Sequence, residues 1–143
     1  MPKPSVLLIA MPWHWFSTPS LQLGILQSVL QRSGIRAQAA TLSLAFMEYC
    51  YERTADRPDA ERLELNDYRV VATEYDHLGL GDWIFAVPPF RDDPEADARY
   101  LDFLRAVGIP ETVVTKAIAM RRLVPGFLAQ AVVGVLAVSP SVV

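Results

Sequence analysis

Cysteine and histidine are scarce in this chain of 143 residues, which contains one cysteine, Cys50, and two histidines. A single cysteine excludes an intramolecular disulfide, a zinc site built from thiolates and an iron–sulfur cluster held by this chain alone. His14 and His77 stand far apart in the sequence, and a lone histidine beside a strand end is more often a satisfied, partly buried side chain than a metal ligand. We therefore expect no metal site, and we expect a reducing, cytoplasmic setting.

An excess of positive charge is also missing. The chain has 13 lysines and arginines against 16 aspartates and glutamates, which gives a formal net charge of −3. A nucleic-acid-binding surface needs a basic face that neutralises phosphates, so no nucleic-acid partner is expected. The acidic run at residues 92–97 (DDPEAD) is interpreted as a solvated loop followed by a helix start, where carboxylates favour the helix dipole.

Glycine-rich phosphate-binding loops and recognisable catalytic sets are absent as well. The sequence contains neither G-x-G-x-x-G nor G-x-x-x-x-G-K-[S/T], so it has no standard loop for cradling a nucleotide. No Ser/His/Asp triad, Cys/His pair or pair of carboxylates can be placed from the spacing. We therefore do not expect the chain to catalyse a reaction on its own.

The hydrophobic residues, 52% of the chain, are enough for one folded domain, and their order indicates an α/β fold. Residues 5–11 (SVLLIAM) are typical of a strand buried on both faces. Residues 20–34 have the apolar period of a helix that Ser20 caps and Gly34 ends, and residues 35–42 predict a second, weaker strand. This order is a βαβ unit with parallel strands. Because the chain length suits one domain and so small a sheet leaves a strand unpaired on one side, we expect a single, incomplete domain over residues 1–143.

The second half of the chain is predicted to be rich in helices. Residues 111–123 and 126–137 are expected to form two helices that Pro125 divides. Residues 123–143 contain no charged side chain, but the stretch between Pro125 and Pro140 is too short, at about 1.5 Å per residue, for a hydrocarbon core roughly 30 Å thick. We therefore expect a buried helix there and no membrane role.

The most unusual stretch is the connection MPWHWFSTPS at residues 11–20. In doubly wound α/β folds, ligands bind beyond the carboxyl ends of the strands, near the first βα turn. The aromatic side chains of residues 11–20 could form a wall for a large cofactor or another domain, or they could cover the core of their own domain. The residues alone leave both interpretations open. Further along, residues 81–90 (GDWIFAVPPF) offer Trp83 and Phe85, whose spacing favours a core role over a place in the same cavity.

Four segments resemble one protein family. They are LLIAMPW, PSLQLGILQSVLQRSGIRAQ, GDWIFA and VPGFLAQAVVGVLAVSPSVV, in this order. Together they are similar to the N-terminal cobalamin-binding region of the RiPP maturation radical-SAM C-methyltransferases, also called bacteriocin maturation radical-SAM proteins. The similarity covers most of the chain and is weakest at residues 52–76. It implies a partial Rossmann-like (flavodoxin-like, doubly wound) domain that binds cobalamin and precedes a radical-SAM barrel.

The resemblance also implies a reaction and a set of contact residues. Methylcobalamin would supply a methyl group, while a radical derived from SAM would activate a carbon of a ribosomally made precursor peptide. Pro12 stands where the D-x-H-x-x-G loop of other cobalamin proteins has aspartate, so His14 is not expected to ligate cobalt. The residues expected to touch the cofactor are Pro12, Trp13, Trp15, Ser17, Thr18, Pro19, Ser20, Trp83 and Phe85.

The chain departs from this family in one large respect, because the C-x3-C-x2-C motif is missing. The [4Fe–4S] cluster, SAM and the barrel would then belong only to the part of the family architecture that this chain lacks. We expect a fragment that is not catalytic alone, with a precursor peptide or a separate radical-SAM chain as partner and with self-association through an exposed sheet edge. The first alternative is a small α/β protein- or peptide-binding module with no cofactor, and the second is a membrane-associated fragment anchored by the apolar C-terminal segment.

Overall fold

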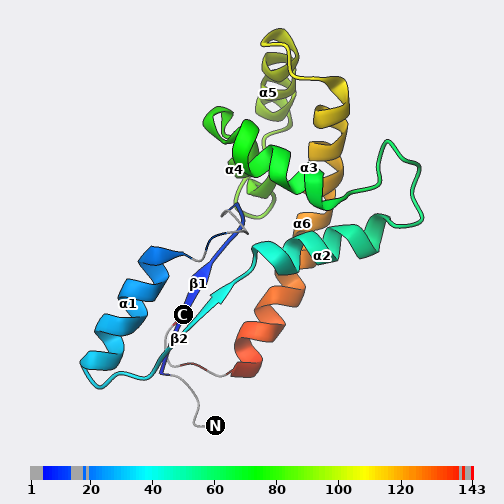
Figure 1. Cartoon of the computed structure of the whole chain (residues 1–143). Coiled ribbons are helices and arrows are strands. Elements are labelled where there is room, and N and C mark those ends of the chain that lie inside the picture. Colours follow the sequence, from blue (N-terminus) through cyan, green and yellow to red (C-terminus); the bar gives the residue numbers. More distant parts are fainter. Residues whose placement is uncertain (1–4, 14–17, 19, 139, 141–142) are drawn as a thin grey trace. The chain divides into compact units, whose positions relative to one another are not determined.

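The structure, a computed structural model, describes residues 5–13, 18, 20–138, 140 and 143. It is an α/β structure with a parallel sheet of two strands and about 64% helix (Figure 1). A π-helical turn, Val70–Glu74, continues the helix Leu65–Arg69, and a 3-10 turn, Asp76–Leu78, precedes the helix Leu80–Phe85. The strands and α-helices are β1 (Val6–Ala10), α1 (Leu21–Arg32), β2 (Ala37–Thr41), α2 (Ser43–Thr54), α3 (Leu65–Arg69), α4 (Leu80–Phe85), α5 (Pro94–Ala106) and α6 (Glu111–Val138).

The βαβ unit predicted for the first forty residues is confirmed. β1 and β2 pair in parallel, with Val6 opposite Ala37, and α1 connects them. The side-chain amides of Gln27 and Gln31 in α1 both donate to the backbone carbonyl of Ala37, at 3.2 Å and 3.3 Å, which ties the helix to the second strand. Gly34 follows α1 with a φ of 77°, the left-handed conformation that commonly ends a helix.

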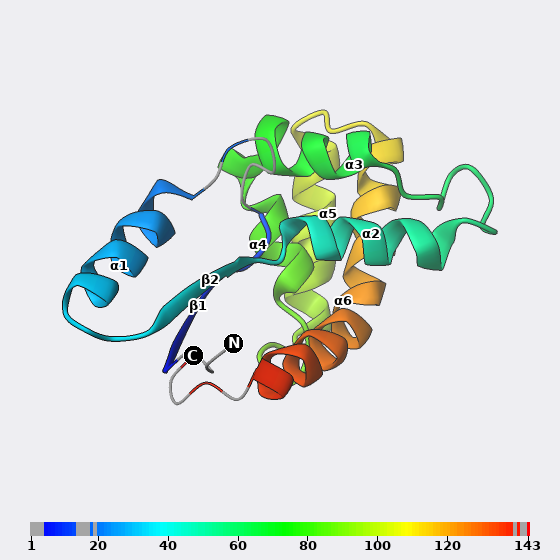
Figure 2. The ribbon, with the colours of Figure 1, turned by 60° about the horizontal axis from the view of Figure 1, so that its bottom comes forward.

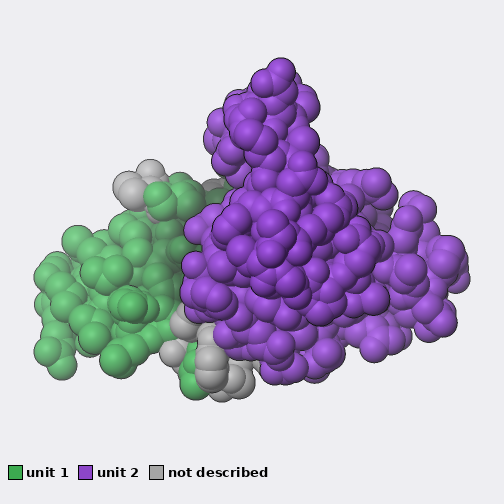
Figure 3. All heavy atoms as spheres, turned by 90° about the horizontal axis from the view of Figure 1, so that it is seen from above, with its two compact units in different colours: residues 1–46, 127–143 green, residues 47–126 purple. Residues whose placement is uncertain are grey.

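The chain divides into two compact units (Figure 3). Unit 1 comprises residues 1–46 and 127–143, and unit 2 comprises residues 47–126. Within unit 1, α1 and the C-terminal part of α6 lie on opposite sides of the two strands (Figure 1 and Figure 2). Unit 2 has a helical core whose fully or almost fully buried side chains include Leu63, Tyr68, Val71, Leu80, Ile84, Leu104, Val114, Ala117, Met120 and Val124.

Helix α6 continues through Pro125, so the predicted division into two helices is wrong. A proline inside a helix removes one backbone hydrogen bond. Here Val124, directly before the proline, and Phe127, two residues after it, are buried, and packing of this kind outweighs local propensity. The helix is long and apolar enough to cross a membrane, and only 11% of its apolar window is buried, so the expectation of a buried helix after Pro125 is wrong. The length argument against a membrane role, which depended on Pro125, therefore does not hold, and the absence of such a role stays a prediction.

A partly buried polar network joins α4, α5 and α6 within unit 2. Nη2 of Arg121 lies 2.7 Å from Oδ2 of Asp97, and Nη1 donates to the backbone carbonyl of Trp83. The indole Nε1 of Trp83 donates to the other carboxylate oxygen of Asp97 at 2.9 Å, and the guanidinium carbon lies 4.5 Å from the indole ring centroid. The side chains of Arg121 and Asp97 are 14% and 24% exposed. The interpretation of residues 92–97 as solvated is thus wrong for Asp97, which is a structural ion-pair partner.

This network generates a stability prediction. Asp97→Asn removes the negative charge and leaves the Arg121 guanidinium unpaired in a partly buried place, so we expect the free energy of unfolding to fall by about 2–3 kcal/mol. Asp102→Asn is the matched control on the same helix, because Asp102 is 79% exposed and lies 3.5 Å from its arginine partner. It should cost less than about 0.5 kcal/mol. Urea unfolding followed by tryptophan fluorescence measures both, and equal stabilities of the two variants would contradict the assignment.

Candidate functional site

The described part of the predicted cofactor site follows β1 at the carboxyl end of the sheet. Met11 is 41% exposed, while Pro12 and Trp13 are half-buried. Thr18, further along the connection, is exposed. Three of the expected contact residues, Trp15, Ser17 and Pro19, lie outside the described residues, as do His14 and Phe16.

Trp13 belongs to an aromatic cluster of unit 1. Its ring meets Phe46 edge-on, with centroids 5.6 Å apart, and Phe46 meets Phe127 with centroids 4.9 Å apart. Phe46 is fully buried and Phe127 is 3% exposed, so the cluster is part of the core. Edge-to-face pairs of this kind add to the free energy of burying the rings. Trp13 therefore covers the core of its own unit with part of its surface and presents the rest, so the two sequence interpretations are compatible for this residue.

Ser20 has the structural role that the sequence predicts for it. It is the N-cap of α1, where its hydroxyl oxygen accepts from the backbone N–H of Leu23 at 3.3 Å, and the hydroxyl lies 3.2 Å from Oε1 of Gln22. Such a cap satisfies one of the backbone donors that the start of a helix leaves open. Ser20 thus fixes where the connection ends and the helix begins.

Trp83 and Phe85 lie on α4 of unit 2. Trp83 is 6% exposed, and its ring stacks on Tyr100 with centroids 5.5 Å apart, in addition to its contacts with Asp97 and Arg121. It is therefore a core residue of unit 2, as its spacing favours. Phe85, the last residue of α4, is half-buried. A contact of either side chain with a cofactor stays a prediction.

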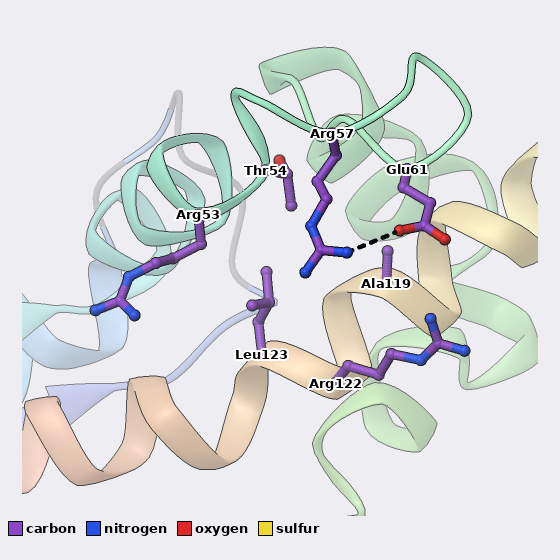
Figure 4. A pocket seen from close by; sticks show the side chains of 7 residues that line it. All are labelled: Arg53, Thr54, Arg57, Glu61, Ala119, Arg122 and Leu123. Atoms are coloured by element: carbon purple, nitrogen blue, oxygen red, sulfur yellow. Dashed lines mark ion pairs between the residues drawn. The ribbon is translucent and has the colours of Figure 1, made fainter.

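Unit 2 has a hollow lined by three arginines, which no motif in the sequence predicts (Figure 4). Its empty volume is about 330 Å³, including space open to solvent. Arg53 is in α2, Arg57 follows the helix, and Arg122 is on α6, so only the spacing of four between the first two was visible in the sequence. The full lining is Arg53, Thr54, Arg57, Glu61, Ala119, Arg122 and Leu123.

Within the parts of the chain that are described, no group of three or more histidine, cysteine, aspartate or glutamate side chains could hold a metal ion. The lone cysteine, Cys50, is 3% exposed, and burial raises the pKa of its thiol to about 12. The thiol is therefore protonated at neutral pH, and a protonated thiol is a poor nucleophile.

No protein-family model matches the chain, and no curated protein or solved structure is found to be similar to it. The resemblance to the RiPP maturation enzymes stays a prediction.

Tyr100, whose ring stacks on Trp83, predicts that the stability of the folded state depends on pH. The hydroxyl of Tyr100 donates to the carbonyl of Leu78 at 3.0 Å, and burial, followed by the negative charge of Asp82, raises the pKa of Tyr100 to about 12. The folded state then holds the phenol proton more tightly than the unfolded state, whose tyrosine has a pKa of about 10. This contribution to stability is present below about pH 10 and is lost as the pH rises towards 12.

Urea unfolding over this pH range tests the contribution of Tyr100. The wild type should lose stability with rising pH more steeply than Tyr100→Phe, which has no phenol proton to lose. Tyr51→Phe is the matched control, because Tyr51 is 56% exposed, and it should keep the slope of the wild type. Parallel curves for the wild type and Tyr100→Phe would show that the folded state does not favour this proton.

Proposed function

We propose that unit 1 is the cobalamin-binding part of a radical-SAM C-methyltransferase system that modifies ribosomally made precursor peptides. The observation that supports this most is the parallel β1–α1–β2 unit, whose long aromatic connection leaves the carboxyl end of β1. Doubly wound domains of the Rossmann-like class bind their cofactors at this edge of the sheet. In the proposal, β1, α1 and β2 form the first part of such a domain.

The described residues fit a corrin. Its faces are broad and mostly apolar, and its rim bears amide groups, so a suitable surface is apolar with hydroxyl groups beside it. Residues 5–13 carry no charged side chain, and Met11 and Trp13 present apolar surface at the strand end. Pro12 and Trp13 would contact the corrin face, and Thr18 would meet the amides, while Ser20 holds the start of α1. Bound cobalamin would supply a methyl group for transfer, and the residues of this chain bind and orient it.

The proposal gives this chain a binding role and assigns the radical chemistry to a partner. A [4Fe–4S] cluster that cleaves SAM needs a set of cysteine ligands, and the sequence contains Cys50 alone, which is buried in unit 2. A separate radical-SAM chain would therefore hold the cluster and SAM. Chemistry of this kind requires a reducing compartment, consistent with a cytoplasmic location.

Titration with hydroxocobalamin, followed by the absorbance of the corrin, tests the proposal. We expect saturable binding that Trp13→Ala weakens about tenfold, because an aromatic wall that excludes water is lost. Trp13→Phe should weaken binding less, because it keeps an aromatic ring against Phe46. Phe90→Ala removes an aromatic ring that is 82% exposed in unit 2 and should bind like the wild type. Absence of saturable binding, or equal affinities of Trp13→Ala and Phe90→Ala, would contradict the proposal.

The surface of α1 favours a second candidate, a protein- or peptide-binding module. None of the residues in Leu21–Arg32, all of which are described, is buried. Leu21, Ile25 and Val29 follow one another at intervals of four residues and are 74%, 54% and 55% exposed. An apolar stripe of this kind normally packs against another element, and a continuous exposed one is typical of an interaction surface. Among the described residues the sheet also has only two strands, which leaves both of its edges without a neighbouring strand.

Self-association measured by sedimentation equilibrium tests this second candidate. We expect the wild type to associate with rising concentration, and we expect the double variant Ile25→Gln/Val29→Gln to associate more weakly because its stripe is polar. Val107→Gln, an exposed position of unit 2, is the control and should behave like the wild type. A wild type that stays monomeric, or a double variant that associates equally well, would count against a role of α1 in self-association.

A further inference from the structure

We propose that the arginine-lined hollow of unit 2 binds a phosphate group. The proposal is independent of the function proposed for unit 1. It follows from the charges around the hollow and from the partners that these charges have (Figure 4).

The lining has an excess of positive charge. Three arginines, Arg53, Arg57 and Arg122, face one carboxylate, Glu61, so the local sum is +3 − 1 = +2. The whole chain, in contrast, has a net charge of −3. A phosphate monoester carries about −1.5 to −2 at neutral pH, so one phosphate group would balance this local excess, whereas one carboxylate would balance half of it.

Among the described residues, two of the three arginines have no carboxylate partner. Arg122 forms no ion pair within the described part of the chain, and the guanidinium of Arg53 lies over the ring of Tyr49, 4.7 Å from its centroid. Contact with an aromatic ring leaves the full positive charge in place. Several other arginines of unit 2 are paired with carboxylates; these are Arg62, Arg69, Arg99, Arg105 and Arg121.

The third arginine occupies the middle of the hollow. Figure 4 shows Arg57 reaching between the other lining residues, with its Nη1 3.6 Å from Oε2 of Glu61. These two side chains are 62% and 38% exposed, and exposed pairs of this length contribute little to stability, so a doubly charged ligand can replace Glu61 as the partner of Arg57.

The two remaining guanidiniums would have to turn inward. Figure 4 shows Arg53 and Arg122 at opposite sides of the hollow, with their guanidinium groups directed away from its middle. Both residues are exposed, and exposed arginine side chains change rotamer readily. The side chains of Ala119 and Leu123 line the hollow without adding charge. Guanidinium groups suit this ligand because their planar set of donors matches two phosphate oxygens at once.

Titration of the chain of 143 residues with inorganic phosphate at constant ionic strength tests the site. The ¹⁵N NMR signals of the arginine Nε–H groups report on each guanidinium. We expect saturable shifts, and we expect Arg57→Gln/Arg122→Gln to weaken binding about tenfold or more because two charge-assisted contacts are lost. Glu61→Gln should bind severalfold more tightly because a competing carboxylate is removed. Arg99→Gln, with a 69% exposed side chain on α5, should bind like the wild type.

A second measurement distinguishes a soluble phosphate from a lipid headgroup. Flotation with phosphatidylcholine vesicles, with and without phosphatidic acid, is carried out on the wild type and on Arg57→Gln/Arg122→Gln. Preference for phosphatidic acid that the double variant loses would assign the phosphate to a headgroup, and binding of inorganic phosphate without this preference would assign it to a soluble ligand. No saturable binding of either probe, or a loss of affinity in Arg99→Gln as large as in the double variant, would overturn the proposal. Circular dichroism checks that each variant is folded.

Discussion

The pairing of Arg121 with Asp97 beside Trp83 is the constraint on which unit 2 depends. A charge that is largely removed from water must be paired, so this contact fixes the position of α6 against α4 and α5. The directions in which the neighbouring side chains of α6 point then follow from helix geometry. Met120 and Val124 turn into the core, whereas Arg122, about 100° further around the helix than Arg121, turns outward to the hollow. Two adjacent arginines thus have different roles: Arg121 is part of the packed interior, and Arg122 places its charge at the hollow.

Elements that are determined by neighbouring residues could be predicted from the sequence. The β1–α1–β2 unit followed from an apolar run, a helical period, the cap at Ser20 and the turn at Gly34, all of which act within a few residues. Long-range contacts overrode local rules elsewhere. Pro125 normally ends a helix, but packing around it holds α6 together. Asp97 looked solvated within its acidic run, because its partner Arg121 is 24 residues away.

The candidate site was less predictable than the fold, because the same side chains suit a core and a ligand. The resemblance predicts that both Trp13 and Trp83 contact the cofactor. In the structure Trp83 is buried within its own unit, whereas Trp13 keeps part of its surface exposed. The hollow of unit 2 could not be predicted for a different reason, because its lining residues form no motif in the sequence. Arg57 and Arg122 lie far apart in the sequence, and the fold brings them together without any local motif. A pattern search therefore finds aromatic segments readily and misses a cluster of charges of this kind.

Cofactor binding and protein docking, as proposed for unit 1, would use different surfaces, so a docking helix does not require the absence of a cofactor. An isolated helix of twelve residues is marginal in water, so α1 depends on its cap, on the two glutamine contacts with Ala37 and on the half-buried Leu23 and Leu30. A partner on the apolar stripe would add stability to α1, and a cofactor at the strand end would add stability to β1. Because each binding event favours the same folded arrangement of β1, α1 and β2, each would increase the affinity for the other. A cofactor-binding edge and a docking helix are thus compatible roles for one βαβ unit.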